Sequence, residues 1–319
     1  MTPVPLDKRD FPKRSRASKG RYVAAGLLLI AASAVLWFSG LPALAYFYAV
    51  MAVSADTARP ALQLGDYEAK IEARPVEGLT RDLSGLTYSP QTGTLFAIVN
   101  RPAQIAELSV EGRLLRTIVL NGVQDPEGLT HVEGGRFIVT SERHQSLHWI
   151  TVDRSTSQVT AEGGDRLRLD FGALRNMGFE GLSWDSRQKR LYIAQEMLPA
   201  RVLVVDGLAS TSTSLNLAVS EWSPHGLAAT FMLDLSSLSL HESTGNLILL
   251  SHLSRILVEY APDGRVLSFL PLWRGMNGLS ASIAQAEGVA IGPDGDVFIV
   301  AEPNLFYRFG KHSDAAEGF

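Results

Sequence analysis

Polar and acidic side chains recur in this chain at three places of one repeated pattern. One place lies directly before a recurring glycine, one lies three residues before that glycine, and one lies fourteen or fifteen residues after it. All but one of these positions hold Asp, Glu, Asn, Gln, Ser or His, and Gly178 is the exception. The positions are Asp82, Ser84, Asn100, Asp125, Glu127, Glu142, Gly178, Glu180, Glu196, Asp234, Ser236, His252, Gln285, Glu287 and Glu302.

Two interpretations of this pattern follow from its chemistry. Carboxylates that converge at short range repel one another and must be protonated, paired or bridged by a cation. An oxygen-rich set without cysteine favours calcium, which takes six to eight oxygen ligands, over zinc or copper. Alternatively, each Glu-Gly step is a structural device, in which the glycine allows a close backbone approach and the glutamate accepts hydrogen bonds from a neighbouring strand.

Other chemistries find little support in the residues. The chain has no cysteine, which excludes disulfides, thiol catalysis and zinc-thiolate sites. It has no nucleophile elbow, phosphate-binding loop or dinucleotide fingerprint. His252 is the one histidine in the pattern, and a lone histidine is more often structural than catalytic. Arg101 and Arg143 follow two of the pattern positions, where we expect them to offset the acids.

The polar positions are carried by five copies of a two-strand unit, each with a turn-rich break between its strands. The units begin 43, 53, 56 and 51 residues apart, at Leu83, Pro126, Phe179, Leu235 and Ala286. A third apolar segment follows each unit, as at residues 104–108 and 256–260, and a fourth follows several of them. Four antiparallel strands every 40–50 residues are typical of a propeller blade. Helical periodicity is nearly absent after residue 60.

The sequence therefore predicts an all-β domain over residues 66–310, a five-bladed β-propeller of four-stranded antiparallel blades. The last unit is followed by only one further strand before a polar tail at 311–319, so its outer strand must come from elsewhere. Residues 67–73 are the expected donor, which would close the ring and leave no open edge. A degenerate sixth blade near residues 206–230 is the alternative.

The N-terminal part has the composition of a membrane anchor. Residues 1–21 carry seven bases and two acids, a net charge of +5, whereas the remainder carries −9. Residues 22–55 hold no charge, and this apolar stretch exceeds the ~20 residues of a spanning helix, with Gly40 and Pro42 marking a kink or an end.

The basic flank predicts one transmembrane helix in the inner cell membrane, with a cytoplasmic N-terminus and the propeller in the periplasm or outside. A cleaved signal peptide ending at Ala43-Leu-Ala45 is the alternative. The acidic domain makes nucleic acid an unexpected partner.

Taken in order, several motifs resemble those of the SdiA-regulated family of bacterial envelope proteins, which are distantly similar to NHL-repeat propellers. They are LSGL at 83–86, DPEGL at 125–129, NMGFEGL at 176–182, QAEGV at 285–289 and EPNLFYRF at 302–309. The resemblance covers about residues 67–309 and implies a five-bladed propeller with bound calcium. On the residues that match its motifs, the expected ligands are Glu127, Glu180 and Glu287, with Glu142, Glu196 and Glu302 as second candidates. Ser236 and Ser237 replace Glu-Gly in the fourth unit, which is at odds with a symmetric ring of five ligands.

Two functions are compatible with this interpretation. The first is a non-enzymatic module that calcium steadies and whose mouth binds an unknown protein or small-molecule ligand at the membrane surface. It is favoured because no nucleophile or base pair is identifiable. The second is a calcium-dependent hydrolase of the lactonase or esterase kind, in which the metal polarises a carbonyl. Glu180 or Glu127 would act there with His252.

Overall fold

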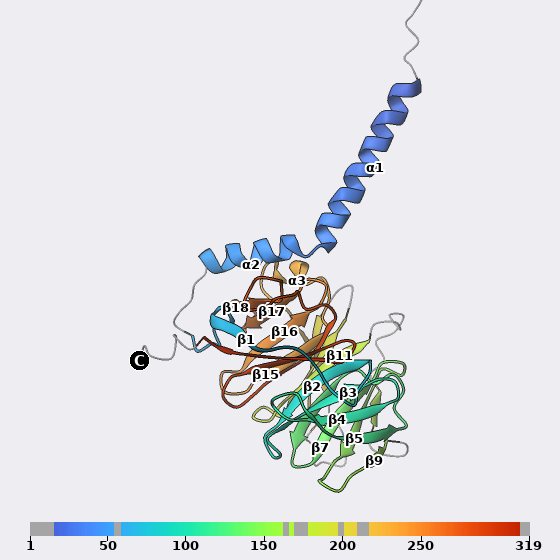
Figure 1. The fold of residues 1–319 in the computed structure, drawn as a ribbon, viewed down its shortest axis with the longest axis vertical. Helices are drawn as coiled ribbons and strands as arrows, with labels where there is room; N and C mark the ends of the chain where they lie inside the picture. Colours follow the sequence, from blue (N-terminus) through green and yellow to red (C-terminus); the bar gives the residue numbers. More distant parts are fainter. Residues whose placement is uncertain are drawn as a thin grey trace, which may run out of the picture.

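The computed structural model describes residues 16–53, 59–161, 166–168, 178–196, 201–208 and 217–312 (Figure 1). Two helices, α1 (Arg16–Phe38) and α2 (Leu41–Val53), lead through a short 3-10 turn (Leu64–Asp66) into a body of strands. Most of the basic segment 1–21 and of the polar tail 311–319 lies outside the described residues. The same is true of residues 54–58 in the linker and of residues 176 and 177 in one motif.

The body is a β-propeller, as the repeats predict. Within the described residues each blade has four antiparallel strands in a row, from the channel outward. In blades 1 and 2 these are β2 (Leu83–Ser89), β3 (Thr94–Val99), β4 (Gln104–Leu108) and β5 (Leu114–Asn121), then β6 (Leu129–Glu133), β7 (Arg136–Ser141), β8 (Ser146–Thr151) and β10 (Arg166–Arg168). In blades 3 and 4 they are β11 (Phe179–Asp185), β12 (Arg190–Gln195), β13 (Arg201–Asp206) and β14 (Ala218–Trp222), then β15 (Ser237–His241), β16 (Asn246–Ser251), β17 (Ile256–Tyr260) and β18 (Val266–Pro271). In blade 5 they are β19 (Ala286–Ile291), β20 (Val297–Ala301), β21 (Leu305–Lys311) and β1 (Tyr67–Pro75).

The ring closes through the two ends of the domain. β1 pairs antiparallel with β21, from Tyr67 opposite Lys311 to Pro75 opposite Leu305. The innermost strands touch in the cyclic order β2, β6, β11, β15, β19 and back to β2. Five blades and the closing strand are therefore confirmed. In the described part of 206–230 the chain forms the outer strand β14 and one helical turn, α3 (Ala228–Phe231), and no further blade.

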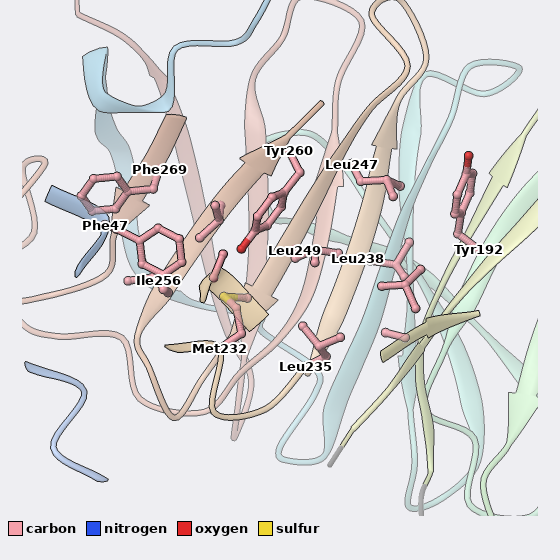
Figure 2. Packing of buried hydrophobic residues seen from close by; sticks show 14 of the residues in the cluster. Phe47, Tyr192, Met232, Leu235, Leu238, Leu247, Leu249, Ile256, Tyr260 and Phe269 are labelled. Carbon is pink, nitrogen blue, oxygen red and sulfur yellow. The ribbon is translucent and has the colours of Figure 1, made fainter. Parts of the chain in front are cut away.

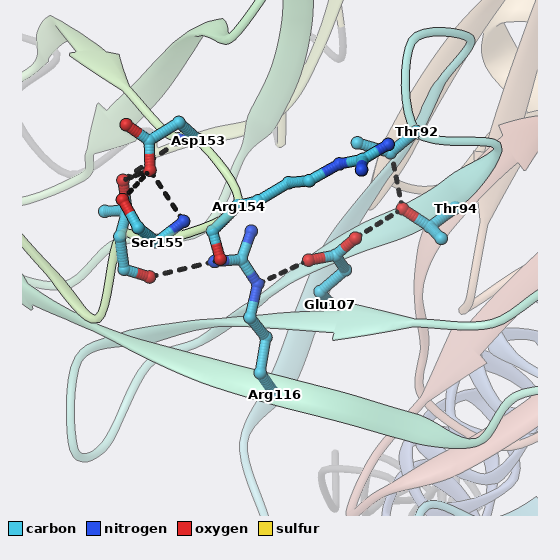
Figure 3. A network of polar contacts seen from close by, with 8 residues as sticks. Thr92, Thr94, Glu107, Arg116, Asp153, Arg154 and Ser155 are labelled. Atoms are coloured by element: carbon cyan, nitrogen blue, oxygen red, sulfur yellow. Dashed lines mark hydrogen bonds and ion pairs between the residues drawn. The ribbon is translucent and has the colours of Figure 1, made fainter.

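One strand departs from the four-stranded plan. β9 (Gln158–Thr160) pairs in parallel with β5, so a segment that follows blade 2 adds a fifth strand to blade 1. Arg116 on β5 holds this segment, because its Nε atom donates to Glu107 Oε2 at 2.6 Å and its Nη1 atom donates to the carbonyl oxygens of Arg154 and Thr156 (Figure 3). Glu107 is buried and also accepts from Thr94 Oγ1 at 2.8 Å. This polar network therefore ties two blades together.

The recurring glycines let adjacent inner strands approach closely. A Cβ atom at Gly85 would lie 2.3 Å from the carbonyl oxygen of Glu127, and one at Gly181 would lie 2.9 Å from Cα of Ser237. A Cβ atom at Gly288 would lie 2.9 Å from the carbonyl carbon of Gly85. The structural role expected of the glycine in each Glu-Gly step is thus present in the fold.

Hydroxyl side chains two residues after the glycine position join one inner strand to the next. Thr87 Oγ1 accepts from the amide of His131 at 3.2 Å, and Thr130 Oγ1 accepts from the amide of Trp184 at 3.0 Å. Ser183 Oγ accepts from the amide of Leu240 at 2.9 Å. Because each bond links successive blades, these contacts hold the channel wall in one arrangement.

The apolar stretch at the N-terminus forms two helices. α1 projects away from the propeller, whereas α2 lies across blade 4 (Figure 1). One helix, over Arg21–Phe38, is long and apolar enough to cross a membrane. Gly40 separates the two helices with a backbone φ of +79°, a conformation that favours glycine. The break expected at this glycine is therefore present, but the residues after it pack on the propeller.

Candidate functional site

The acidic positions meet at one end of the propeller channel because of strand register. In blade 3 Phe179 pairs with Gln195, so Glu180 and Glu196 lie at the same end of the blade. In blade 5 Ala286 pairs with Ala301, which places Glu287 and Glu302 together in the same way. The five blades are arranged around one axis, so the corresponding residues of every blade face that end. We call these side chains the acidic ring: Glu127, Glu142, Glu180, Glu196, Glu287 and Glu302, together with Asn100, Asp234, His252 and Gln285.

Two of the glutamates sit in β-bulges at the start of an inner strand. The pairing of β11 with β12 shifts between Phe179 and Gly181, which leaves Glu180 as the extra residue. The pairing of β19 with β20 shifts in the same way around Glu287. A bulge re-aims a side chain relative to a regular strand and is frequent next to functional sites.

Glu180 is the electrostatic centre of the acidic ring. Its pKa is raised well above the usual value, first by burial and then by repulsion from Glu127, Glu196, Glu142 and Glu287. Five of the six expected ligands therefore share one electrostatic field. The charge of a group in such a place is costly unless a proton or a cation offsets it.

Glu127 and Glu287 lie on either side of this centre. The pKa of Glu127 is raised to about 7, by burial first and then by Glu142 and Glu302, against hydrogen bonds from Ser84 and Asn100 that lower it. The pKa of Glu287 is likewise raised to about 7, by burial first and then by Glu302, Asp234 and Glu127, against His252, which lowers it. Glu302, the sixth expected ligand, thus joins the ring through both of these residues.

Glu142 and Glu196 complete the set from the ends of the second strands. The pKa of Glu142 is raised by burial and by Glu196 and Asp125, and the pKa of Glu196 is raised by burial and by Asp234. Gly178, the exception in the sequence pattern, makes room for the acids. A Cβ atom there would lie 2.2 Å from Glu180 Oε1 and 2.9 Å from Glu142 Oε1.

The amide side chains of the ring orient the carboxylates. Asn100 Nδ2 donates a short hydrogen bond to Glu127 Oε1, and Gln285 Nε2 donates to Glu302 Oε2 at 3.3 Å. Asn100 Oδ1 is buried and has no hydrogen-bond donor among the residues that the structure describes. A buried amide oxygen without a donor is the type of atom that a hard cation would satisfy.

In blade 4 the ring holds a paired histidine and aspartate. His252 Nδ1 lies 2.8 Å from Asp234 Oδ2 and 3.8 Å from Glu287 Oε1. Asp234 is fully buried and accepts from Ser251 Oγ and from the amide of Leu253. Burial lowers the pKa of His252, but Asp234, Glu287 and Glu196 raise it by more, so the net direction is upward.

Asp234 is an acid of the ring that the expected ligand set leaves out. Its position, three residues before Ser237, belongs to the repeated pattern, so the signal is present in the sequence. Ser236 and Ser237 replace the Glu-Gly step in this blade, so that step does not mark it. In blade 4 Asp234 and His252 stand at pattern positions, and blades 2, 3 and 5 have a glutamate at the position of His252.

The donor chemistry of the ring fits a hard cation, although the side chains do not form a closed cage. Carboxylate and amide oxygens predominate, and together they match the ligands of calcium. Across the described ranges, however, no three His, Asp or Glu side chains have a geometry that could hold a metal ion as they stand. The acids converge without coordinating around one point, so an ion would have to draw them together.

Two arginines offset the acids at the outer edge of the ring, as expected. Arg101 Nε lies 3.6 Å from Asp82 Oδ2, and Arg143 Nε donates to Asp125 Oδ2 at 2.8 Å. Both guanidinium groups are more than half exposed. These ion pairs engage the outer aspartates, and the charge of Arg143 also partly opposes the rise in the pKa of Glu142.

The opposite end of the channel has a different character. A cavity of about 500 Å³ lies there among the turns of all five blades, with His131 and His241 in its lining. Burial lowers the pKa of both histidines, which favours their neutral form. The nearby hydroxyls of Thr130 and Ser183 join neighbouring blades.

Three solved structures that resemble this chain are of enzymes. The glutaminyl cyclase of Myxococcus xanthus has 14% identity and a TM-score of 0.49, covering 76% of this chain and 95% of that one. A luciferin-regenerating enzyme has 14% identity and a TM-score of 0.48, covering 77% and 95%. A streptogramin B lyase has 10% identity and a TM-score of 0.47, covering 78% and 99%. At these values none of them bears on the chemistry of this chain.

A match to a protein family covers most of the sequence. The family profile described as SdiA-regulated aligns with residues 59–310, which include the closing strand β1, all five blades and every member of the acidic ring. This range agrees with the extent of the resemblance seen in the motifs. The chain therefore belongs to the SdiA-regulated family.

Proposed function

We propose that this protein is a membrane-anchored, extracytoplasmic β-propeller that binds calcium at its acidic ring and presents that end of the channel to a protein or small-molecule ligand. One observation carries the proposal. Glu180 is half-buried, its pKa is raised by this burial and by four other glutamates, and no ion pair among the described residues joins it to an arginine or lysine. A divalent cation would remove the repulsion within this group.

The residues that would hold the ion are the glutamates nearest the channel axis. Glu127 lies two residues before β6, and Glu180 and Glu287 are the second residues of β11 and β19. The other three, Glu142, Glu196 and Glu302, directly follow β7, β12 and β20. When bound, calcium would neutralise the ring and cross-link blades. The protein's own contribution is to crowd the acids and to orient Glu127 through Asn100.

Localisation follows from the N-terminal helix. α1 has the length and composition of a spanning segment, and the bases that precede it favour a cytoplasmic N-terminus. Ala43 and Leu44, which belong to the alternative cleavage site, are buried against blade 4. This burial favours retention of the anchor over its removal, because cleavage there would expose an apolar surface.

Thermal unfolding with and without calcium tests the proposal. An ion that binds only the folded state stabilises it by about 2.7 kcal/mol at a hundred times its Kd, so the Tm of the full chain in detergent should rise with calcium and fall with chelator. Glu180→Gln should reduce this response strongly. Glu133→Gln, an exposed acid at the opposite end of the channel, is the matched control and should respond as the wild type does. A Tm that is indifferent to calcium and chelator would refute the metal site.

A calcium-dependent hydrolase remains the second candidate, on the strength of the His252–Asp234 pair. A buried aspartate that holds Nδ1 of a histidine leaves Nε2 as a potential general base. A panel of lactones and aryl esters tests this activity in the presence of calcium. Wild-type turnover that is lost in both Glu180→Gln and His252→Gln would support the hydrolase. Wild-type turnover no greater than that of Glu180→Gln would refute it.

A further inference from the structure

Helix α2 has no polar face. Its thirteen residues, LPALAYFYAVMAV, include no charged side chain. One face packs on blade 4, where Ala43, Leu44 and Phe47 are buried (Figure 2). The ring of Phe47 lies 5.8 Å from that of Phe269 on the outermost strand β18. This contact fixes the helix to the rim of the propeller.

The opposite face of α2 is apolar and uncovered. Its residues follow helical spacing along one side, and we call them the outer face: Leu41, Ala45, Tyr48, Ala49, Ala52 and Val53. Leu41 is 48% exposed, Tyr48 is 51% exposed and Val53 is 87% exposed. A helix on the surface of a soluble domain normally turns a polar face outward, and a helix that is apolar all round is buried by something.

The position of α2 indicates what covers this face. α2 begins three residues after α1 ends, so its N-terminal end cannot be far from the end of the spanning helix. The corner between the helices is held against the propeller. A Cβ atom at Gly40 would lie 3.0 Å from the Trp273 ring and 3.1 Å from the carbonyl oxygen of Ser254, and Arg255 Nη1 lies 3.5 Å from the carbonyl oxygen of Ser39.

Aromatic side chains cluster around the same corner. Tyr46 stacks on Phe231 of α3 with ring centroids 4.3 Å apart, and Trp37, near the end of α1, lies 5.6 Å from Phe231. Leu227, just before α3, is 61% exposed and extends the apolar surface. Tyr and Trp are enriched where a membrane protein crosses the headgroup region, so this group matches the composition of an interface.

We infer that α2 lies in the headgroup region of the bilayer with its outer face against lipid, and that it holds the propeller to the membrane by the rim of blade 4. This inference rests on the proposed role of α1 as the anchor. The corner touches Leu253 and Ser254, which follow His252 of the acidic ring. The acidic ring therefore opens beside the membrane surface, where its ligand would have to approach along the bilayer.

Site-specific labelling of the full chain in nanodiscs tests this placement. The chain lacks cysteine, so one introduced cysteine carries one label. An environment-sensitive NBD label is placed at Tyr48→Cys or Val53→Cys on the outer face, at Leu29→Cys in the middle of α1, and at Thr92→Cys in a blade 1 turn. Tyr48→Cys removes the ring contact between Tyr48 and Phe269, whereas Val53→Cys leaves it in place, so the second position shows whether loss of that contact alters the result. Each variant is measured in phosphatidylcholine with and without brominated acyl chains.

We expect a blue shift and bromine quenching at Leu29→Cys, Tyr48→Cys and Val53→Cys, and neither effect at Thr92→Cys. Quenching at Leu29→Cys with water-like emission at both α2 positions would overturn the inference and leave the anchor intact. A blue shift at the α2 positions without quenching, together with cross-linking of two chains at Val53→Cys, would overturn it in favour of a second copy. Absence of quenching at Leu29→Cys would refute the anchor and, with it, this inference.

Discussion

His252 Nδ1 lies 2.8 Å from Oδ2 of the fully buried Asp234, and both residues belong to the fourth blade. Blade 4 lacks the Glu-Gly step of its neighbours and supplies an acid and a base instead. Because Glu287 and Glu196 also act on His252, the pair is coupled to the glutamates on both sides. The ring is therefore continuous, although the repeat is irregular.

The protonation of His252 should depend on Asp234. Asp234→Asn keeps an oxygen that can accept from Ser251 and Leu253 but removes the negative charge, so the pKa of His252 should fall. A histidine NMR titration in chelator would measure the change, with His131 at the other end of the channel as an internal control. An unchanged pKa would mean that Glu287 and Glu196, and not Asp234, raise it.

Stability without calcium should fall as the pH rises toward neutrality. Glu127 and Glu287 have pKa values of about 7 in the folded protein, against 4.5 for an ordinary glutamate. The folded state therefore binds more protons than the unfolded state between these values, and losing them destabilises the fold. Urea unfolding in chelator should show a free energy of unfolding that declines from about pH 4.5 to 7 and then levels off.

Calcium and a double substitution separate this effect from other titrations. Saturating calcium should flatten the decline, because the ion replaces the protons. The variant Glu127→Gln/Glu287→Gln should flatten it without calcium. A wild-type profile in chelator that rises over this interval would show that the two glutamates are not crowded in the folded protein.

The close approach of inner strands should make Gly85 intolerant of a side chain. Gly85→Ala would place a methyl group 2.3 Å from the carbonyl oxygen of Glu127 at a φ of +39°, so both strain and overlap oppose it. We expect a loss of about 2–5 kcal/mol from these two effects together. Chemical unfolding of the variant measures this loss.

Gly93 is the matched control for strain alone. Its φ is +69°, yet a Cβ atom there has no neighbour within 4 Å. Gly93→Ala should therefore cost only about 1–2 kcal/mol. Equal losses for the two variants would show that the inner strands can move apart at little cost.

The attachment of the parallel strand β9 should depend on Arg116. Arg116→Met removes the partner of the buried Glu107 and the donors to two carbonyl oxygens (Figure 3). We expect a loss of about 1–3 kcal/mol and faster hydrogen exchange over residues 158–160. Arg113→Met, whose ion pair with Glu111 is exposed, should change stability by less than about 1 kcal/mol. Unaltered exchange in β9 would indicate that backbone pairing alone holds it.

The sequence alone predicts the repeat, five blades with a degenerate sixth as the alternative, and a resemblance to the family. Each two-strand unit is local, so its alternation and turns are visible within about twenty residues, and the missing outer strand of the last unit pointed to residues 67–73. It also placed the six glutamates at equivalent positions, because strand register is a local property. Equivalent positions in a closed ring must converge.

How these parts meet depends on contacts between residues far apart in the chain. The bulges that aim Glu180 and Glu287, and the pairing of His252 with Asp234, depend on the backbone of facing strands and on residues 18 positions apart. The docking of α2 on blade 4 joins residues more than 200 positions apart. An apolar run reads the same whether lipid or a propeller covers it, so composition marked the break at Gly40 but could not reveal that the residues after it pack on blade 4. The folded structure places α2 on blade 4, because folding brings Phe47 against Phe269 of β18.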